Sequence, residues 1–264
     1  MLPSALSALD EITSLQNPLS PAFFFDFDGT LTPIVDRPEL AYLSEVVRIT
    51  LASLARQSPV AIVSGRDRID VEKRVRLKSV FYAGSHGLDI IGPEASRWQP
   101  EKSDDFLPLL LAAKSSIEKS LQGIEGIQIE TKAFSFSVHY RLASEQSHER
   151  VKTIVQDTLR DSPTLKSMEG KRVLEVLPAI DWDKGKAVLW LLEKLKTNGS
   201  NGYFPIFIGD DLTDEMAFKA VREKGIGILV SDQARESAAS FQLLSVTEVH
   251  RFIGIISDRL MDSN

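Results

Sequence analysis

The segment from Phe23 to Thr32 constrains the fold of this chain more than any other, because a strongly apolar run stops abruptly at two acidic residues. Three consecutive phenylalanines precede Asp26 and Asp28, and a glycine and two threonines follow them. A continuous apolar run is typical of a strand that is buried on both faces of a parallel sheet. Open α/β sheets bind ligands beyond the carboxyl ends of such strands. We therefore expect Asp26 and Asp28 to lie at the ligand-binding edge of a sheet.

Two other apolar runs end in the same way. Residues 60–63 lead into Ser64-Gly65-Arg66, and residues 204–208 lead into Gly209-Asp210-Asp211. Stretches with helical spacing separate these runs, and strands that alternate with helices indicate a parallel sheet. The sequence thus predicts an α/β fold with a doubly wound, Rossmann-like parallel sheet. Its helices are expected at residues 44–56, 67–75, 184–196 and 214–224, and further strands at 80–83 and 226–230.

The pattern changes between residues 98 and 178. Phe134, Phe136, Val138 and Tyr140 alternate with Ser135, Ser137, His139 and Arg141, as in a sheet with one solvent-exposed face. Helices at 104–121 and 144–160 and strands at 127–131, 165–168 and 173–177 complete a separate α+β module. We predict a core domain formed by residues 1–97 and 179–264, with a smaller cap domain inserted at 98–178.

Composition excludes several classes of protein. The 264 residues carry a net charge of −6 and no cysteine. An acidic chain does not favour nucleic acid or anionic membranes as partners, and without cysteine there are no disulfides and no thiolate chemistry. The stretch 1–17 has no basic start and is a poor signal peptide, and no run approaches the ~20 apolar residues of a membrane span. We expect a cytoplasmic protein with no obligate protein partner.

The acidic motifs also have simpler interpretations. An Asp-x-Asp-Gly sequence occurs in calcium loops, where position six is glycine and position twelve glutamate. Counted from Asp26 these positions are Leu31 and Arg37, so a calcium loop of this type is excluded. Asp210 and Asp211 match the preference for aspartate at a helix N-terminus. This interpretation becomes weaker once the second acidic motif is considered together with the first.

The carboxylates predict a cation. If the three strands are neighbours, five aspartates converge, namely Asp26, Asp28, Asp210, Asp211 and Asp214. Like charges at ~4 Å repel by several kcal/mol at an effective dielectric constant of ~20. Oxygen ligands select Mg²⁺ or Ca²⁺, and a phosphate substrate favours Mg²⁺. We expect a Mg²⁺-dependent phosphatase with Asp26 as the nucleophile.

Four ordered motifs resemble those of the haloacid dehalogenase superfamily of phosphatases. They are Asp26-Phe-Asp-Gly-Thr-Leu31, Ser64-Gly65-Arg66, Lys184-Gly185 and Gly209-Asp-Asp-x-x-Asp-Glu215. The resemblance implies that Asp26 is the nucleophile and Asp28 the general acid/base, while Ser64 and Lys184 hold the phosphoryl group. It also implies that Asp26, the backbone carbonyl of Asp28 and Asp210 bind Mg²⁺, supported by Asp211 and Asp214.

Within that superfamily the chain is most similar to the trehalose-6-phosphate phosphatase family. This similarity is carried by Gly84-Ser-His-Gly87, Glu130-Thr-Lys132, His139-Tyr-Arg141, Gly170-Lys171 and the run from Gly209 to Phe218. It implies a small-molecule sugar phosphate as substrate, bound by the cap through Glu130, Lys132, Arg141, Lys171 and Glu175. We add Gly65, Arg66 and His86 of the core as candidate substrate-binding residues. Leu177 stands where the family often has arginine.

Other functions remain open from the sequence. The substrate could be another sugar phosphate, such as sucrose phosphate or mannosylglycerate phosphate. A phosphosugar mutase with the same fold would use the same phosphoaspartate and return the phosphoryl group to the sugar. A non-catalytic sensor of sugar phosphates is disfavoured, because the complete catalytic set is present.

Overall fold

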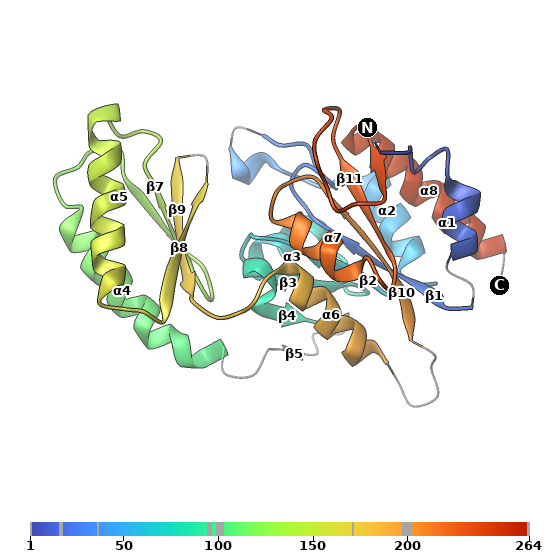
Figure 1. Cartoon of the computed structure of the whole chain (residues 1–264), viewed down its shortest axis with the longest axis horizontal. Helices are drawn as coiled ribbons and strands as arrows, with labels where there is room; N and C mark the ends of the chain where they lie inside the picture. Colours follow the sequence, from blue (N-terminus) through green and yellow to red (C-terminus); the bar gives the residue numbers. More distant parts are fainter. Residues whose placement is uncertain are drawn as a thin grey trace. The chain divides into compact units, whose positions relative to one another are not determined.

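A computed structural model describes residues 2–15, 18–35, 37–93, 97–98, 103–170, 172–196 and 202–262. The chain divides into two compact units, of which the first comprises residues 1–98 and 182–264 and the second residues 99–181 (Figure 1). Each unit has its own sheet and its own hydrophobic core.

The first unit is built on a sheet in the order β12-β11-β10-β1-β2-β3-β4-β5. The strands are β1 (Ser20–Phe25), β2 (Val60–Val63), β3 (Phe81–Gly84), β4 (Asp89–Ile91), β5 (Arg97–Trp98), β10 (Tyr203–Gly209), β11 (Ile226–Val230) and β12 (Phe241–Leu243). Strand β1 lies between β10 and β2 and is parallel to both, whereas β4 and β5 are antiparallel. The predicted neighbourhood of the three motif-bearing strands, and the predicted fold class, are confirmed.

Alternate residues of β1 enter two different cores, as the period of a strand requires. Phe23 and Phe25 belong to one core with residues of α1 (Leu9–Leu15), α2 (Glu45–Leu54), α3 (Arg68–Val75) and α8 (Val246–Asp262). Phe24 faces the other way, toward α6 (Lys184–Leu195) and α7 (Asp214–Val221). Burial of each such ring contributes about 1.5–3 kcal/mol. Helices on both faces therefore fix the strand end that carries Asp26.

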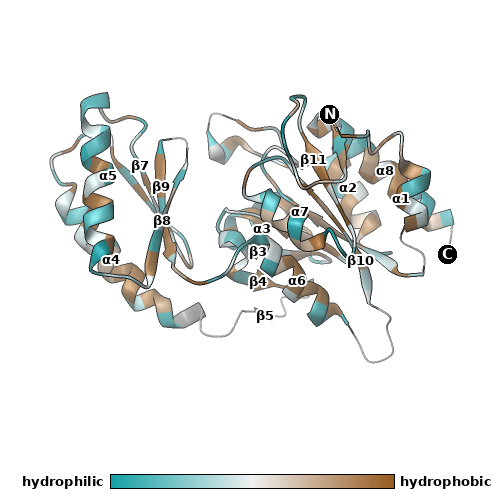
Figure 2. Cartoon of the chain, in the orientation of Figure 1, coloured by the Kyte–Doolittle hydropathy of each residue, from teal (hydrophilic) through white to brown (hydrophobic). Residues whose placement is uncertain are grey.

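The second unit is an antiparallel sheet in the order β6-β7-β9-β8, packed against two helices. Its elements are α4 (Leu107–Ser120), β6 (Gln128–Thr131), β7 (Phe136–His139), α5 (Glu145–Arg160), β8 (Leu165–Gly170) and β9 (Val173–Pro178). Figure 2 shows the hydrophilic outer face of α5, as expected for a helix that covers a sheet. The polar face in and just before β7 is less exposed than the predicted solvent-exposed side, because Ser135 and Ser137 are both 3% exposed.

The pairing of the first residues with the far end of the chain was not predicted. Ser4 forms a parallel bridge with Gln242, whose side chain also accepts a hydrogen bond from the backbone N–H of Leu2. Ala5, Leu9 and Ile12 enter the core next to α8. Among the described residues, no helix combines the length and the apolar character that a bilayer crossing requires.

Candidate active site

The carboxyl ends of β1 and β10 bring the first and last acidic motifs together. The register pairs Phe25 with Ile208, and the backbone N–H of Asp26 donates to the carbonyl of Ile208 at 2.9 Å. Asp26 therefore follows its strand at the level where β10 ends. The side chain of Asp26 is 7% exposed, so its charge is almost fully withdrawn from solvent.

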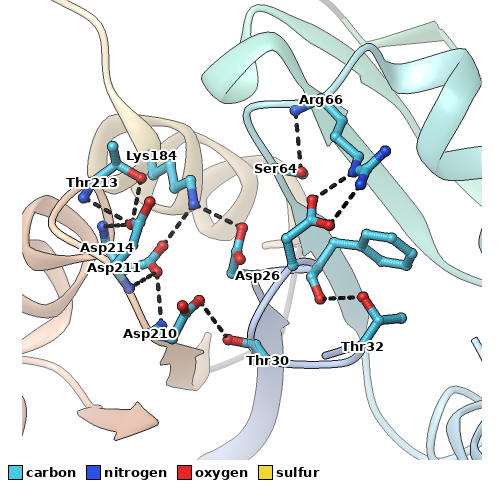
Figure 3. A network of polar contacts seen from close by, with 12 residues as sticks. Asp26, Thr30, Thr32, Ser64, Arg66, Lys184, Asp210, Asp211, Thr213 and Asp214 are labelled. Atoms are coloured by element: carbon cyan, nitrogen blue, oxygen red, sulfur yellow. Dashed lines mark hydrogen bonds and ion pairs between the residues drawn. The ribbon is translucent and has the colours of Figure 1, made fainter. Parts of the chain in front are cut away.

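Lys184, at the start of α6, lies between two aspartates (Figure 3). Its Nζ donates to Oδ1 of Asp26 and to Oδ1 of Asp214, each at 2.7 Å. The helix begins at this point because Asp183 caps it, accepting a hydrogen bond from the N–H of Lys186 at 3.0 Å. Residues separated by 158 positions thus form one buried ion-pair network.

Asp214 and Asp211 organise the loop between β10 and α7. Oδ2 of Asp214 accepts from the backbone N–H groups of Asp210 and Asp211, at 3.0 and 3.1 Å. Oδ1 of Asp211 accepts from the N–H groups of Thr213 and Asp214, as an N-cap side chain does. Both carboxylates therefore hold the backbone of the loop, and the side chain of Asp210 is left to face Asp26.

Burial and mutual repulsion make Asp26, Asp210 and Asp214 hard to ionise. Burial raises the pKa of Asp26 well above its usual value, and Asp214 and Asp210 add to this while Lys184 opposes it. Burial, reinforced by Asp214 and Asp211, raises the pKa of Asp210 to about 7. For Lys184, burial alone would lower the pKa, but Asp26 and Asp214 reverse the direction and raise it. Lys184 thus stays protonated. A further positive charge nearby would stabilise the ionised forms of Asp26 and Asp210.

The donor set fits a hard divalent cation. Asp26, Asp210 and Asp214 each offer an oxygen, and these oxygens lie within 4.8 Å of one another. Carboxylate oxygen is the ligand that Mg²⁺ prefers. Because both oxygens of Asp214 already accept hydrogen bonds, Asp26 and Asp210 are the better candidates. Gly29, with φ of +82°, leaves space for Asp210, since a Cβ atom there would lie 2.1 Å from Oδ2 of Asp210.

Asp28 forms a second cluster with the motif that follows β2. Arg66 donates two hydrogen bonds to the Asp28 carboxylate, from Nε to Oδ2 at 2.5 Å and from Nη2 to Oδ1 at 2.7 Å. The backbone N–H of Arg66 donates to Oγ of Ser64 at 3.2 Å, and Ser64 is itself buried. The structure therefore places the side chains of Asp28 and Arg66 in direct contact.

His86 lies next to the same motif on a strained turn. Ser85 and His86, in the 3-10 turn Ser85–Gly87, have backbone φ angles of 48° and 57°. Residues other than glycine rarely adopt such positive values. The N–H of His86 donates to the carbonyl of Ser64 at 3.0 Å. A Cβ atom at Gly65 would lie 2.8 Å from the imidazole of His86. A side chain at position 65 would require the imidazole of His86 to shift away from the Ser64 turn.

Three of the candidates in the second unit, Glu130, Lys132 and Glu175, form polar contacts across its sheet. Nζ of Lys132 lies 2.8 Å from Oε1 of Glu175, which also accepts from Oγ of Ser135 at 2.8 Å. Glu130 contacts His139 at 3.0 Å. Arg141 is exposed beyond the end of β7. Lys171 lies outside the described residues, so its place relative to this group stays a prediction.

Several contacts around the core site were missed from the sequence. Arg235, in the loop after β11, donates from Nη2 to the carbonyls of Asp210 and Asp211 at 3.0 and 3.2 Å. Its guanidinium also lies 3.5 Å from Oε1 of Glu215. Oγ1 of Thr30 lies 3.4 Å from Oδ1 of Asp210. Thr30 is part of the first motif and could have been suspected, whereas no local pattern distinguishes Arg235 from a surface arginine.

Comparison with known proteins gives one consistent result. The sequence model of the family described as Trehalose-phosphatase matches residues 24–247. "Probable trehalose-phosphate phosphatase E" of Arabidopsis thaliana is 42% identical over 261 residues, which cover 95% of this chain and 74% of the relative. "Trehalose 6-phosphate phosphatase RA3" of Zea mays is 40% identical over 272 residues, which cover 97% and 75% of the two chains.

Solved structures share the fold. The C-terminal domain of a C. albicans trehalose-6-phosphate phosphatase has a TM-score of 0.78 at 22% identity and covers 98% of this chain and 99% of that one. A haloacid dehalogenase-like hydrolase from Bacteroides thetaiotaomicron has a TM-score of 0.63 at 16% identity, covering 93% and 100%. The similarity to solved structures thus extends over both units.

Proposed function

The chain belongs to the trehalose-phosphatase family, and we propose that it hydrolyses trehalose 6-phosphate to trehalose and inorganic phosphate. The resemblance to this family that the motifs carry is confirmed, and the fold is shared with a haloacid dehalogenase-like hydrolase. The family consists of phosphoric monoester hydrolases. The observation that carries the proposal for this chain is the buried contact of Lys184 with Asp26, beside Asp210 and Asp214.

Phosphate monoesters hydrolyse so slowly without a catalyst that enzymes reach accelerations of up to ~10²¹-fold. One general acid supplies only ~10²–10⁴ of this, so several groups act together. In the first step, an oxygen of Asp26 attacks phosphorus, the bond from phosphorus to the sugar oxygen breaks, and Asp28 gives its proton to that oxygen. A phosphoaspartate and free trehalose result.

In the second step, Asp28 removes a proton from water while the water oxygen attacks the same phosphorus. The bond from phosphorus to Asp26 breaks, the Asp26 carboxylate is restored, and phosphate leaves. Lys184 holds positive charge against the phosphoryl oxygens in both steps. Ser64 donates a hydrogen bond to one of these oxygens.

We propose that Mg²⁺ is held by Asp26, Asp210 and the backbone carbonyl of Asp28. When bound, the ion neutralises the negative charge of the transferring phosphoryl group. Support comes from the all-oxygen donor set and from the raised pKa of Asp210, which is caused by burial and by the neighbouring carboxylates of Asp214 and Asp211. Asp211 and Asp214 support the site without binding the ion directly, because their oxygens already accept hydrogen bonds from the loop backbone and from Lys184.

We further propose that the second unit is the cap that binds the sugar. Its candidates are Glu130, Lys132, Arg141, Lys171 and Glu175, and support comes from the charged group on the sheet, with Lys132 and Glu175 in contact. Charged hydrogen-bonding groups of this kind can bind the hydroxyls of a disaccharide. A cap also excludes water from the reacting centre.

The proposal is tested by measuring phosphate release from a panel of sugar phosphates, with Mg²⁺ and with EDTA. The panel holds trehalose 6-phosphate, sucrose 6-phosphate, mannosylglycerate phosphate and glucose 6-phosphate, and the sugar product is analysed in each reaction. We expect Mg²⁺-dependent release that is fastest with trehalose 6-phosphate. Preference for another member of the panel would change the substrate, and an isomerised sugar phosphate without free phosphate would indicate a mutase.

A further inference from the structure

Arg66 fixes the plane of the Asp28 carboxylate. Its Nε and Nη2 atoms donate to the two different oxygens of that carboxylate. A bidentate pair of this kind sets orientation as well as charge, which a single ammonium group cannot do. The guanidinium carbon also lies 5.6 Å from the centre of the Phe27 ring, so the arginine packs beside the residue that separates the two aspartates.

The backbone of Arg66 is held from two sides. Its N–H donates to Oγ of Ser64, and its carbonyl accepts from the N–H of Ser85 at 2.8 Å. Arg66 is therefore attached to the ends of β2 and β3. The side chain of Arg66 is 14% exposed, against 34% for Asp28, so the arginine is the more enclosed partner.

A second ion pair anchors the far end of the guanidinium. Nη1 of Arg66 donates to Oδ2 of Asp70 at 2.9 Å, and Asp70 lies in the first turn of α3. Asp70 is also bound by Arg74, whose Nη2 lies 2.8 Å from Oδ1. Arg74 in turn donates to the carbonyls of Glu39 and Ala41. Burial would raise the pKa of Asp70, but the two arginines lower it.

The four charges alternate in sign from the site to the helix. Asp28 contacts Arg66, Arg66 contacts Asp70, and Asp70 contacts Arg74. Because Asp70 and Arg74 belong to one turn of α3, the rigid helix fixes the outer end of the series. The inner end meets the residue to which we assign proton transfer.

We propose that Arg66 is a positioning residue that aligns Asp28 for proton transfer, and that Asp70 and Arg74 hold Arg66 in place. The inference rests on the proposed role of Asp28 as general acid/base. It gives Arg66 a different role from the predicted one in substrate binding, and support comes from the engagement of the guanidinium by two carboxylates. An acid that has lost its alignment transfers its proton less well, and this matters most when the leaving oxygen is strongly basic.

The test uses Asp70→Ala and its matched control Glu72→Ala, purified as the full chain. Glu72 lies on the same helix and pairs with Arg68 at 2.7 Å, outside the series. For each protein, kcat/KM is measured with trehalose 6-phosphate and with aryl phosphates from 4-nitrophenyl to phenyl phosphate. This quantity reports the step that breaks the bond to the leaving group. Arg66→Lys is measured in parallel, because lysine keeps the charge but not the bidentate geometry.

We expect Asp70→Ala to lower kcat/KM about tenfold for trehalose 6-phosphate and less than twofold for 4-nitrophenyl phosphate, with phenyl phosphate between them. A tenfold loss is part of the ~10²–10⁴ that a general acid supplies. Arg66→Lys should rank the three substrates in the same order, with a larger difference in kcat/KM loss between trehalose 6-phosphate and 4-nitrophenyl phosphate. Glu72→Ala should keep kcat/KM within twofold of the wild type for every substrate.

Three outcomes would overturn the proposal. Equal losses on all substrates indicate a defect of folding or of phosphate binding. A loss confined to trehalose 6-phosphate, with none along the aryl series, indicates a sugar contact. No loss in Asp70→Ala shows that α3 does not position the arginine. If the wild type releases phosphate from no sugar phosphate, the proposed function itself fails, which is a separate result.

Discussion

The ammonium group of Lys184 and the carboxylate of Asp26 form a contact of 2.7 Å in which both side chains are withdrawn from water. The lysine meets Asp214 at the same distance, so one cation serves two buried carboxylates. Breaking such a network is costly, because a charge that loses its partner stays buried. Lys184 therefore supports the fold of the core as well as the proposed chemistry.

Replacing Lys184 with methionine, which has a similar length, tests the first role. We expect the variant to lose about 3–5 kcal/mol of unfolding free energy at pH 7 without Mg²⁺, because Asp26 and Asp214 then lack a cation. The loss should shrink at pH 5, where these carboxylates take up protons more readily. Urea unfolding followed by circular dichroism measures both values. A difference below 1 kcal/mol at pH 7 would contradict the assigned role.

The raised pKa of Asp210 predicts how the metal-free protein responds to pH. That pKa is about 7 in the folded chain, against an ordinary value of 3.8. Between these values the folded state binds more protons than the unfolded state, so the unfolding free energy falls as pH rises, by up to about 1.4 kcal/mol per pH unit from this group. The lowered pKa of Asp70 acts with opposite sign, but at more acidic pH.

Thermal unfolding in EDTA from pH 5 to pH 7.5 measures this dependence. We expect the melting temperature to fall across the range, and saturating Mg²⁺ to raise it more at pH 7.5 than at pH 5.5. Binding of a cation replaces the missing positive charge and stabilises the folded state by mass action. A melting temperature that rises with pH in EDTA, or is indifferent to Mg²⁺, would show that the acidic cluster is not a cation site.

Gly29 provides a test of Asp210 that does not depend on catalysis. An added methyl group would lie 2.1 Å from Oδ2 of Asp210, in a backbone conformation with φ of +82°. Gly123 has nearly the same φ, +85°, but open space around its Cβ position. We expect Gly29→Ala to displace Asp210 and weaken Mg²⁺ binding at least tenfold, measured by the shift of melting temperature with Mg²⁺ concentration. Gly123→Ala should suffer the backbone strain alone and keep the wild-type Mg²⁺ affinity.

Substitutions in the second unit should weaken recognition of the sugar and leave the reaction at the phosphoryl group unchanged. We expect Glu175→Gln and Lys132→Met to lower kcat/KM for trehalose 6-phosphate by about 10–100-fold, since a hydrogen bond to a charged group contributes about 1.5–3 kcal/mol. The value for 4-nitrophenyl phosphate should change less than twofold. Lys114→Met is the control, because Lys114 pairs with Glu118 on α4 of the same unit, away from the sheet candidates. Equal losses on both substrates would refute the sugar-binding assignment.

The sequence allowed the core site to be predicted because its residues are tied to strand ends. The apolar runs before Asp26, Ser64 and Asp210 indicate parallel strands, and parallel neighbours present their ends at one edge. The contact of Arg66 with Asp28 spans 38 positions and has no local signal. The same holds for Arg235, which reaches Asp210 from a loop 25 positions away.

The solvent-exposed face predicted for the second sheet shows a different limit of prediction from the sequence. The alternation at Ser135 and Ser137 correctly separates two faces, because side chains alternate along a strand. It does not say what covers each face. In the structure both serines are buried, and Ser135 donates to Glu175 on a neighbouring strand. A cytoplasmic location and the roles assigned to the site residues stay predictions.

The role of Asp26 as nucleophile is tested most directly by phosphate release from trehalose 6-phosphate with the Asp26→Asn variant and saturating Mg²⁺. Asparagine has nearly the same shape but cannot form the phosphoaspartate. Circular dichroism and a substrate-induced rise in melting temperature verify that the variant is folded and binds trehalose 6-phosphate. We predict a loss of at least about 10⁴-fold in kcat, close to 5.5 kcal/mol in activation free energy. A folded variant that keeps a tenth of the wild-type kcat would contradict this prediction.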